Sequence, residues 1–200
     1  MRTVVETVVT HLYKFEELSE EAQDRAVEKN WDICLHDDWY YDLKCNFETE
    51  IAPVFGLSID NIYWSGFYSQ GDGACFTGSF EYAPGMLEWV RNHYTRISDL
   101  YDIAKRLAEV QRKAFYQLHG NIKHRGHYYH SGCTDFTTYR GDNLANDDEE
   151  NSIKEIYREL MDYFYRTILQ AEYDYLTSRD CIEAHLEDSD YEFNEEGELQ

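Results

Sequence analysis

Hydrophobic positions recur along the chain at two spacings: every second residue, as in strands, and every third or fourth residue, as in helices. Residues 4–15 are rich in Val and Thr and predict a strand. Ser19, followed by acidic residues, is a suitable N-cap for a helix that extends to about Leu35. A second helix is predicted to end at Pro53 and Gly56. Its apolar stripe consists of Trp39, Leu43, Phe47 and Ile51.

Two hairpins are predicted in the middle of the chain. The segments 59–67 and 74–82 predict antiparallel strands around the turn 69–73, whose two glycines can adopt positive φ. The segments 122–130 and 134–140 predict a second hairpin with a short Ser-Gly turn. Strands that come as hairpins favour an antiparallel sheet over a doubly wound parallel one.

Helical spacing dominates the rest of the chain. A heptad-like seam covers residues 86–118, and Ser98 could cap a new helix there and divide the segment into two. A second stripe covers residues 153–175. A short helix is predicted over 178–186, and an acidic hairpin over 191–199.

These elements predict an α+β fold, with a mainly antiparallel sheet of two or more hairpins packed against long amphipathic helices. The length suits one domain, residues 1–200, with an acidic helix-plus-hairpin segment at about residues 178–200. We find no targeting signal and no run of ~18 apolar residues that could span a bilayer. Five scattered cysteines without a CxxC pair favour reduced thiols in a cytoplasm.

Charge narrows the choice of partner. The chain holds 40 acidic and 18 basic residues, a net charge of −22, yet 42% of its residues are hydrophobic and 16% aromatic, so it has enough apolar surface to fold. The ends are acidic, whereas residues 101–140 hold seven basic and three acidic residues. A field of this sign repels nucleic acid and anionic membranes and favours a partner with a basic surface.

A histidine-rich segment invites a metal interpretation. His124, His127, His130 and Cys133 are spaced by three residues, as zinc ligands can be. On the predicted strand, however, side chains alternate, so His124 and His130 would share one face while His127 and Cys133 would share the other. No metal site and no cofactor are therefore predicted.

The glycine-rich hairpin offers an enzyme alternative. Asp72 and Cys75 lie among glycines, and a histidine of the second hairpin could activate a nucleophile there. A tight hairpin with an aromatic face explains the same residues without chemistry. The candidates of this alternative, which includes metal binding, are Asp72, Cys75, His124, His127 and His130.

The basic stretch also carries aromatic residues, as a small nucleic-acid platform would. Because the surrounding charge opposes phosphate approach, we expect these cations to pair with the protein's own acids, and no direct nucleic-acid binding. The cations are Lys105, Arg106, Arg112, Lys113, Lys123, Arg125 and Arg140.

Two segments resemble a known family. The string WSGFYSQGDGACF, from Trp64, and the string KHRGHYYH, from Lys123, are similar to segments of an uncharacterised family of bacteriophage and prophage proteins. The resemblance covers about residues 15–191. It implies a phage product that acts in the cytoplasm of a bacterial host, and it brings no catalytic residues.

The leading hypothesis is a non-enzymatic, phage-encoded anti-defence inhibitor. In composition it resembles acidic DNA mimics, the type of anti-CRISPR or antirestriction protein that binds a host restriction, CRISPR or nuclease complex. Its partner would be a host protein with a basic surface, without direct nucleic-acid or membrane binding, and a homodimer is left open. A structural or scaffold protein is the third alternative. The expected partner-binding residues are Asp37, Asp38, Asp42, Asp147, Asp148, Glu149, Glu150, Glu183, Glu187, Asp188, Asp190, Glu192, Glu195, Glu196 and Glu198.

Overall fold

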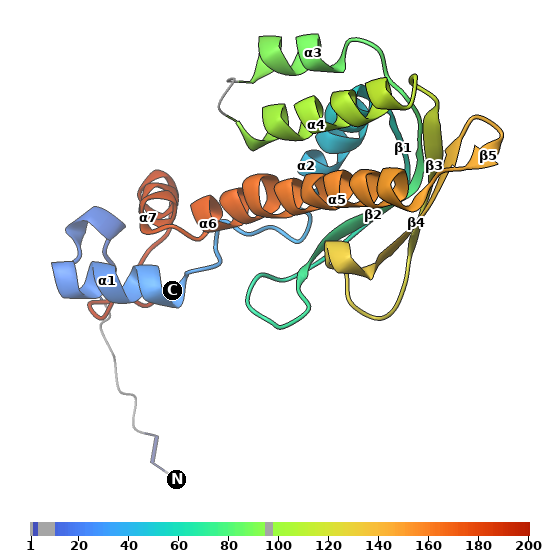
Figure 1. The fold of residues 1–200 in the computed structure, drawn as a ribbon. Helices are drawn as coiled ribbons and strands as arrows, with labels where there is room; N and C mark the ends of the chain where they lie inside the picture. Colours follow the sequence, from blue (N-terminus) through green and yellow to red (C-terminus); the bar gives the residue numbers. More distant parts are fainter. Residues whose placement is uncertain (1, 4–10, 95–97) are drawn as a thin grey trace. The chain divides into compact units, whose positions relative to one another are not determined.

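The computed structural model describes residues 2–3, 11–94 and 98–200, which form two compact units (Figure 1). Unit 1 combines both ends of the chain, Met1–Trp39 and Glu172–Gln200, and unit 2 is Tyr40–Ala171. The sequence predicted one domain. The structure instead divides the chain, because apolar residues of the two ends pack on each other in a core of their own. Local periodicity cannot show such a pairing.

Unit 2 confirms the α+β prediction. Its five-stranded sheet has the order β1-β2-β3-β4-β5, and every neighbouring pair is antiparallel. Both predicted hairpins are present: β1 pairs with β2, and β3 pairs with β4. The strands are β1 Leu57–Ser65, β2 Gly73–Phe80, β3 Leu118–His124, β4 Thr134–Arg140 and β5 Asn143–Leu144.

Helices cover one face of this sheet (Figure 1). In β3, Leu118, Gly120 and Ile122 are buried and the residues between them are exposed, so the other face is open. The long helix α5 packs on β2, β4 and α4. The helical segments of unit 2 are α2 Tyr41–Asn46, the π-helical η2 Phe47–Ile51, the 3-10 helix η3 Ala52–Phe55, α3 Met86–His93, α4 Asp99–Lys113, the 3-10 helix η4 Ser131–Cys133, α5 Asp147–Tyr163 and the π-helical η5 Phe164–Gln170.

Aromatic residues form the centre of the unit 2 core. Tyr157 is fully buried, and its hydroxyl donates a hydrogen bond to the carbonyl of Phe55 at 2.9 Å. Burial raises the pKa of this hydroxyl, so it stays a donor. The rings of Phe80 and Phe136 pack around it at centroid distances of 5.0 and 6.4 Å. The buried polar group is thus satisfied inside an apolar cluster.

The heptad-like segment is divided, as one alternative predicted, because Ser98 caps α4 by accepting from the amide of Tyr101. The prediction that helix continues to Leu118 is wrong. The chain leaves the helix at Phe115 and Tyr116, which both have positive φ. The reason is Gln111, whose buried side chain donates to the carbonyl of Leu118 at 2.8 Å and accepts from its amide at 3.3 Å, so that β3 begins there.

Unit 1 is built from α1 (Glu20–Lys29), α7 (Arg179–Asp188), the short η1 (Phe15–Glu17) and a C-terminal turn. Helix α6, Ala171–Leu176, leads into it from unit 2. The rings of Phe15 and Phe193 meet edge to face at 6.1 Å. Its buried residues come from both ends of the chain: Phe15, Leu18, Ala22, Ala26, Val27, Ile182, Leu186 and Phe193.

Predictions for unit 1 were accurate at caps and less so at helix ends. Ser19 and Ser178 are N-caps, as predicted. The first helix ends at Lys29 rather than Leu35, because the Asn30 side chain donates to the Ala26 carbonyl and closes the last turn.

The ends of the chain meet in isolated bridges. Within the predicted strand 4–15, residues 4–10 lie outside the described residues, and beyond them Tyr13 forms one antiparallel bridge to Phe193. The predicted C-terminal hairpin is reduced to the bridge between Phe193 and Leu199. In the described part of the chain, no helix has the length and apolar character needed to cross a bilayer.

Candidate functional site

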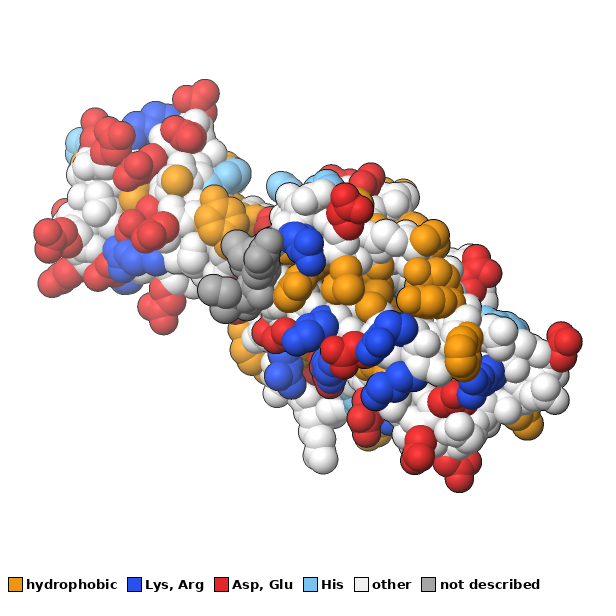
Figure 2. All heavy atoms as spheres, turned by 45° about the horizontal axis from the view of Figure 1, so that its top comes forward, with side chains coloured by type: hydrophobic (Ala, Val, Ile, Leu, Met, Phe, Trp, Pro, Cys, Tyr) orange, Lys and Arg blue, Asp and Glu red, His pale blue; other side chains and the backbone are white. Residues whose placement is uncertain are grey.

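Acidic residues are concentrated in unit 1. It holds 21 of the 40 acidic residues and 5 of the 18 basic ones, a net charge of −16 in 68 residues, whereas unit 2 carries −6 in 132. Figure 2 shows Asp and Glu side chains over the visible face of the unit that contains α1 and α7. Ten of the fifteen predicted partner-binding acids lie in unit 1 and five in unit 2.

Arg179 uses up two acids of unit 1. Its guanidinium lies 2.6 Å from Asp24 of α1 and 2.5 Å from Glu183 of α7. Arg179 therefore links α7 to α1, and its two carboxylate partners come from opposite ends of the chain. Glu183, a predicted partner-binding residue, is thus a structural residue of unit 1.

Lysines bind further acids of unit 1. Lys29 lies 2.6 Å from Glu198, and this ammonium, together with a hydrogen bond from Asn194, holds the pKa of Glu198 below its ordinary value. Lys14 donates to the carbonyl of Asp190 at 3.0 Å, while the nearest Asp190 carboxylate oxygen is 3.9 Å away. Glu198 is therefore held by the fold, and the Asp190 carboxylate only loosely.

Four exposed acids follow one another at the carboxyl end of α7, and we call them the α7-end acids: Glu187, Asp188, Asp190 and Glu192. This end of a helix carries a partial negative charge, so each carboxylate in the last turn costs about 0.3–1 kcal/mol. Among the ion pairs of the described residues, the contact of Asp190 with Lys14 is the one that involves this group. Helix stability does not explain where these acids lie.

The acidic run at the start of α5 has the opposite character. Asn146 caps the helix by accepting from the Glu149 amide, and the Glu149 carboxylate accepts from the Asn146 amide. Glu149 also lies 3.0 Å from Arg140, and Glu150 accepts from the Thr138 amide at 3.2 Å. Glu149 and Glu150, two of the predicted partner-binding acids, thus hold the helix to the sheet.

The remaining predicted acids are exposed but dispersed. Asp37 and Asp38 lie in a turn of unit 1, and Asp42 lies in the first turn of α2 in unit 2. The other two acids of the α5 run are exposed in its first turn, where they favour the helix. Glu195 and Glu196 are exposed in the C-terminal turn of unit 1. Sequence reasoning missed Trp31, an aromatic residue of unit 1 that is 50% exposed, because no periodic stripe includes it.

The structure brings the two hairpins together, although not as predicted. The chain leaves β3 at His124 and turns at Gly126, so His130 lies in a loop and not on a strand. His130 Nε2 is 3.4 Å from the sulfur of Cys133, two groups that the strand prediction placed on opposite faces. Gly73 makes room, since a Cβ there would lie 2.6 Å from the His130 Cα.

The other candidates of the enzyme hypothesis have structural surroundings. The Asp72 carboxylate accepts from the amides of Tyr68 and Ser69 and closes the glycine-rich turn. His124 stacks on Tyr63 at a centroid distance of 5.2 Å. Burial raises the pKa of the Cys75 thiol to about 12, which keeps it protonated. Among the residues that the structure describes, no three metal-ligating side chains are grouped around one point.

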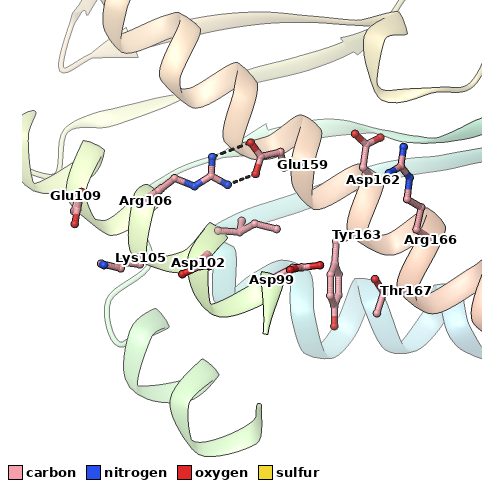
Figure 3. Close-up of a pocket in the computed structure, with 11 residues that line it drawn as sticks. Asp99, Asp102, Lys105, Arg106, Glu109, Glu159, Asp162, Tyr163, Arg166 and Thr167 are labelled. Carbon is pink, nitrogen blue, oxygen red and sulfur yellow. Dashed lines mark hydrogen bonds and ion pairs between the residues drawn. The ribbon is translucent and has the colours of Figure 1, made fainter. Parts of the chain in front are cut away.

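A groove of about 700 Å³ is lined by residues of α4, α5 and η5 (Figure 3). Its central contact is the fork of Arg106 onto the Glu159 carboxylate, with one of the two bonds at 2.8 Å. Arg125 lies 3.6 Å from Asp135, and Arg140 is also paired. Three of the seven basic-stretch cations thus contact the protein's own acids, as expected. Acids also line the groove itself: Asp99, Asp102, Glu109, Glu159 and Asp162.

Comparison with known proteins identifies a family for most of the chain. Residues 39–179 match the model of a domain of unknown function (DUF8835). The chain belongs to this family. Neither the curated proteins nor the solved structures contain a match.

The DUF8835 segment coincides closely with unit 2, Tyr40–Ala171. It therefore contains the sheet, both hairpins and the groove beside α4. Helix α1 and the α7-end acids lie outside the matched residues. Most of unit 1, the more acidic unit, thus lies outside the matched residues.

Proposed function

We propose that unit 1 is an acidic binding module that recognises a cationic surface on another protein. The observation that carries the proposal is the group of exposed α7-end acids, two of which, Glu187 and Asp188, lie in the last turn of a helix that they destabilise. Acids kept at a cost to the fold are expected to serve binding, since functional sites retain locally unfavourable features.

Carboxylates can take the place of phosphates in such a contact. A carboxylate accepts two parallel hydrogen bonds from an Arg guanidinium, as a phosphate does. The net charge of −16 on unit 1 would also speed the encounter with a cationic partner at low ionic strength. Trp31 offers a half-exposed aromatic anchor in the same unit.

The partner proposed is a protein that handles nucleic acid, because its surface is already built to bind a chain of negative charges. The resemblance to bacteriophage proteins implies a phage product, and this makes the proposed partner more specific. A phage-encoded inhibitor of a bacterial restriction, CRISPR or nuclease complex would occupy the groove that otherwise holds DNA or RNA.

Capture from bacterial lysate tests the proposal, with two charge-matched variants of the full chain. The test variant neutralises the α7-end acids: Glu187→Gln, Asp188→Asn, Asp190→Asn and Glu192→Gln. The control variant neutralises four exposed acids of unit 2 that have no ion pair among the described residues: Glu50→Gln, Asp60→Asn, Asp142→Asn and Glu155→Gln. Both variants carry −18.

We expect the wild type and the control to retain a nucleic-acid-binding protein, identified by mass spectrometry, and the test variant to lose it. Nuclease or restriction activity measured on the purified captured protein should fall when wild-type protein is added. Equal capture by the test variant and the wild type would contradict the proposal, because the four carboxylates would then be dispensable.

A second candidate function rests on the 3.4 Å contact between His130 and Cys133. The imidazole can accept the thiol proton and leave a thiolate nucleophile, as in cysteine-based enzymes. Arg158 fixes this loop by donating to the carbonyls of Gly132 and Thr134. We expect His130→Ala to slow alkylation of Cys133 by iodoacetamide in the native protein; an unchanged rate would remove this candidate.

A further inference from the structure

Two cysteines from opposite ends of the chain meet in unit 1. The Cys34 thiol donates to the carbonyl of Cys181 at 3.7 Å, which places the Cys34 sulfur beside Cys181. The two residues are 147 positions apart, and both are partly exposed. They lie just outside the two limits of the DUF8835 segment, residues 39 and 179.

Secondary structure fixes both side chains. Cys181 is the third residue of α7, and its amide donates to the capping hydroxyl of Ser178 at 3.3 Å. Cys34 lies in a turn where the Leu35 amide donates to the Asp32 carbonyl, and it packs against the unit 1 core. The contact of the Cys34 sulfur with Cys181 is therefore built into the fold of unit 1.

The two thiols are not equivalent. Burial, then the hydrogen bond with Cys181, raises the pKa of Cys34 to about 11, so Cys34 keeps its proton and acts as the donor. Cys181 lies in the first turn of α7 and is partly exposed, so an oxidant can reach its sulfur.

We propose that Cys34 and Cys181 form a reversible disulfide in response to peroxide. The Cys181 thiolate attacks one oxygen of hydrogen peroxide, the O–O bond breaks, and a sulfenic acid and hydroxide form. The Cys34 sulfur then attacks the Cys181 sulfur, the S–O bond breaks, and water leaves with the Cys34 proton. Two thiols are oxidised by two electrons, and one peroxide is reduced to two water molecules after the hydroxide takes up a proton.

This bond would join the segment that precedes the family domain to the helix that follows it. The small core of unit 1 depends on contacts between those two ends of the chain. A cross-link that closes a loop of this length removes much of the conformational freedom of the unfolded chain. Oxidation is therefore expected to stabilise unit 1, independently of what its acids bind.

The other thiols provide internal controls. Cys75 is buried, and although it interacts with Cys133, the side chain in hydrogen-bond contact with Cys133 is His130. Cys45 lies in α2 of unit 2. Because these thiols lack an accessible thiol contact like that of Cys34, a modest dose of peroxide should leave them uncoupled.

The test treats the native full chain with hydrogen peroxide, blocks remaining thiols with iodoacetamide at low pH, and maps peptides by mass spectrometry without reduction. We expect a single cross-linked peptide pair that contains residues 34 and 181, lost on treatment with dithiothreitol. We also expect the melting temperature of unit 1 to rise on oxidation by roughly 5 °C or more. Hydrogen exchange distinguishes the unfolding of unit 1 from that of unit 2 in this measurement.

Conservative variants separate the proposal from general oxidation. Cys34→Ser and Cys181→Ser should each abolish the cross-link and the gain in melting temperature, whereas Cys45→Ser should leave both unchanged. The proposal is overturned if peroxide leaves both thiols free, if it oxidises them further without a cross-link, or if the cross-link joins another pair.

Discussion

Two acidic clusters in this protein have opposite relations to the helices that carry them. At the start of α5, acids cap the helix, pair with Arg140 and bind the sheet through the Thr138 amide. At the end of α7, acids of the same types extend the negative end of the helix and have little intramolecular contact. The first cluster lies within the matched residues of the family domain, and the second lies outside them in unit 1.

The difference shows that acidic composition alone does not identify a binding surface. A carboxylate near the positive end of a helix stabilises the fold, and one near the negative end opposes it. The position of each acid relative to helix ends and to its own cations is therefore the useful criterion. It separates the four α7-end acids from Glu149, Glu183 and Glu198, whose carboxylates pair with the protein's own cations.

The largest expected effect is the loss of stability of unit 2 at alkaline pH; in unit 1 the pKa of Cys34, raised to about 11, predicts a loss over a narrower pH range. In unit 2, Cys75 has a pKa raised from 9.0 to about 12 by burial, and burial also raises the pKa of Tyr157. A proton that the folded state holds more tightly stabilises it below the unfolded pKa, and this stability is lost as pH rises through the folded pKa. The free energy of unfolding of unit 2 should fall steadily between pH 9 and 12.

Hydrogen exchange across this pH range measures the loss, after correction for the intrinsic exchange rate. Cys75→Ala is the matched variant, since it removes one of the raised groups and should flatten the slope. Unit 2 protection that does not change up to pH 12 would show that its buried groups ionise without cost.

The second test removes the cap of α5. Asn146→Ala should lower the free energy of unfolding of unit 2 by about 1 kcal/mol. Glu149→Gln should cost a similar amount, because it weakens both the capping contact and the pair with Arg140. Thermal unfolding measures both, with Glu155→Gln on the exposed face of α5 as the control. If all three variants melt alike, the run at the start of α5 is not structural.

The third test applies the same change at the end of α7, where the sign should reverse. Glu187→Gln and Asp188→Asn should each stabilise unit 1, by about 0.3–1 kcal/mol, because they remove charge from the negative end of the helix. Chemical denaturation followed by hydrogen exchange in unit 1 gives the value. A loss of stability on neutralisation would mean that these acids have a structural role that their contacts do not explain.

The smallest effect is expected from the exposed pair of Lys29 and Glu198. Lys29 lowers the pKa of Glu198, so the pair contributes stability above the ordinary Glu pKa and loses it as pH falls through the lowered value. Lys29→Met should therefore reduce the protection of unit 1 slightly at pH 7 and not at all at pH 2. A loss that is equal at both pH values would indicate lost packing rather than lost charge.

Local patterns predicted much of the fold. The caps at Ser19, Ser98 and Ser178 and both hairpins followed from side-chain chemistry within a few residues. The division into units did not, because Phe15 and Phe193 meet only in space. The helix end at Lys113 was missed for a related reason: the Gln111 side chain competes with the helix for its backbone partners.

The candidate site was predictable in composition but not in placement. An acidic chain that favours a basic partner follows from charge counting. Which acids are free depends on partners such as Arg179, whose contacts join residues from both ends of the chain. The contact of His130 with Cys133 was not predicted, because a strand was predicted where the chain turns at Gly126.

The most direct test of the central claim is the affinity of the captured partner for the two charge-matched variants at two salt concentrations. If the α7-end acids serve binding, the test variant should bind at least about tenfold more weakly than the control, and the difference should shrink at high salt. Equal affinity of both variants, or affinity that does not change with salt, would contradict the account.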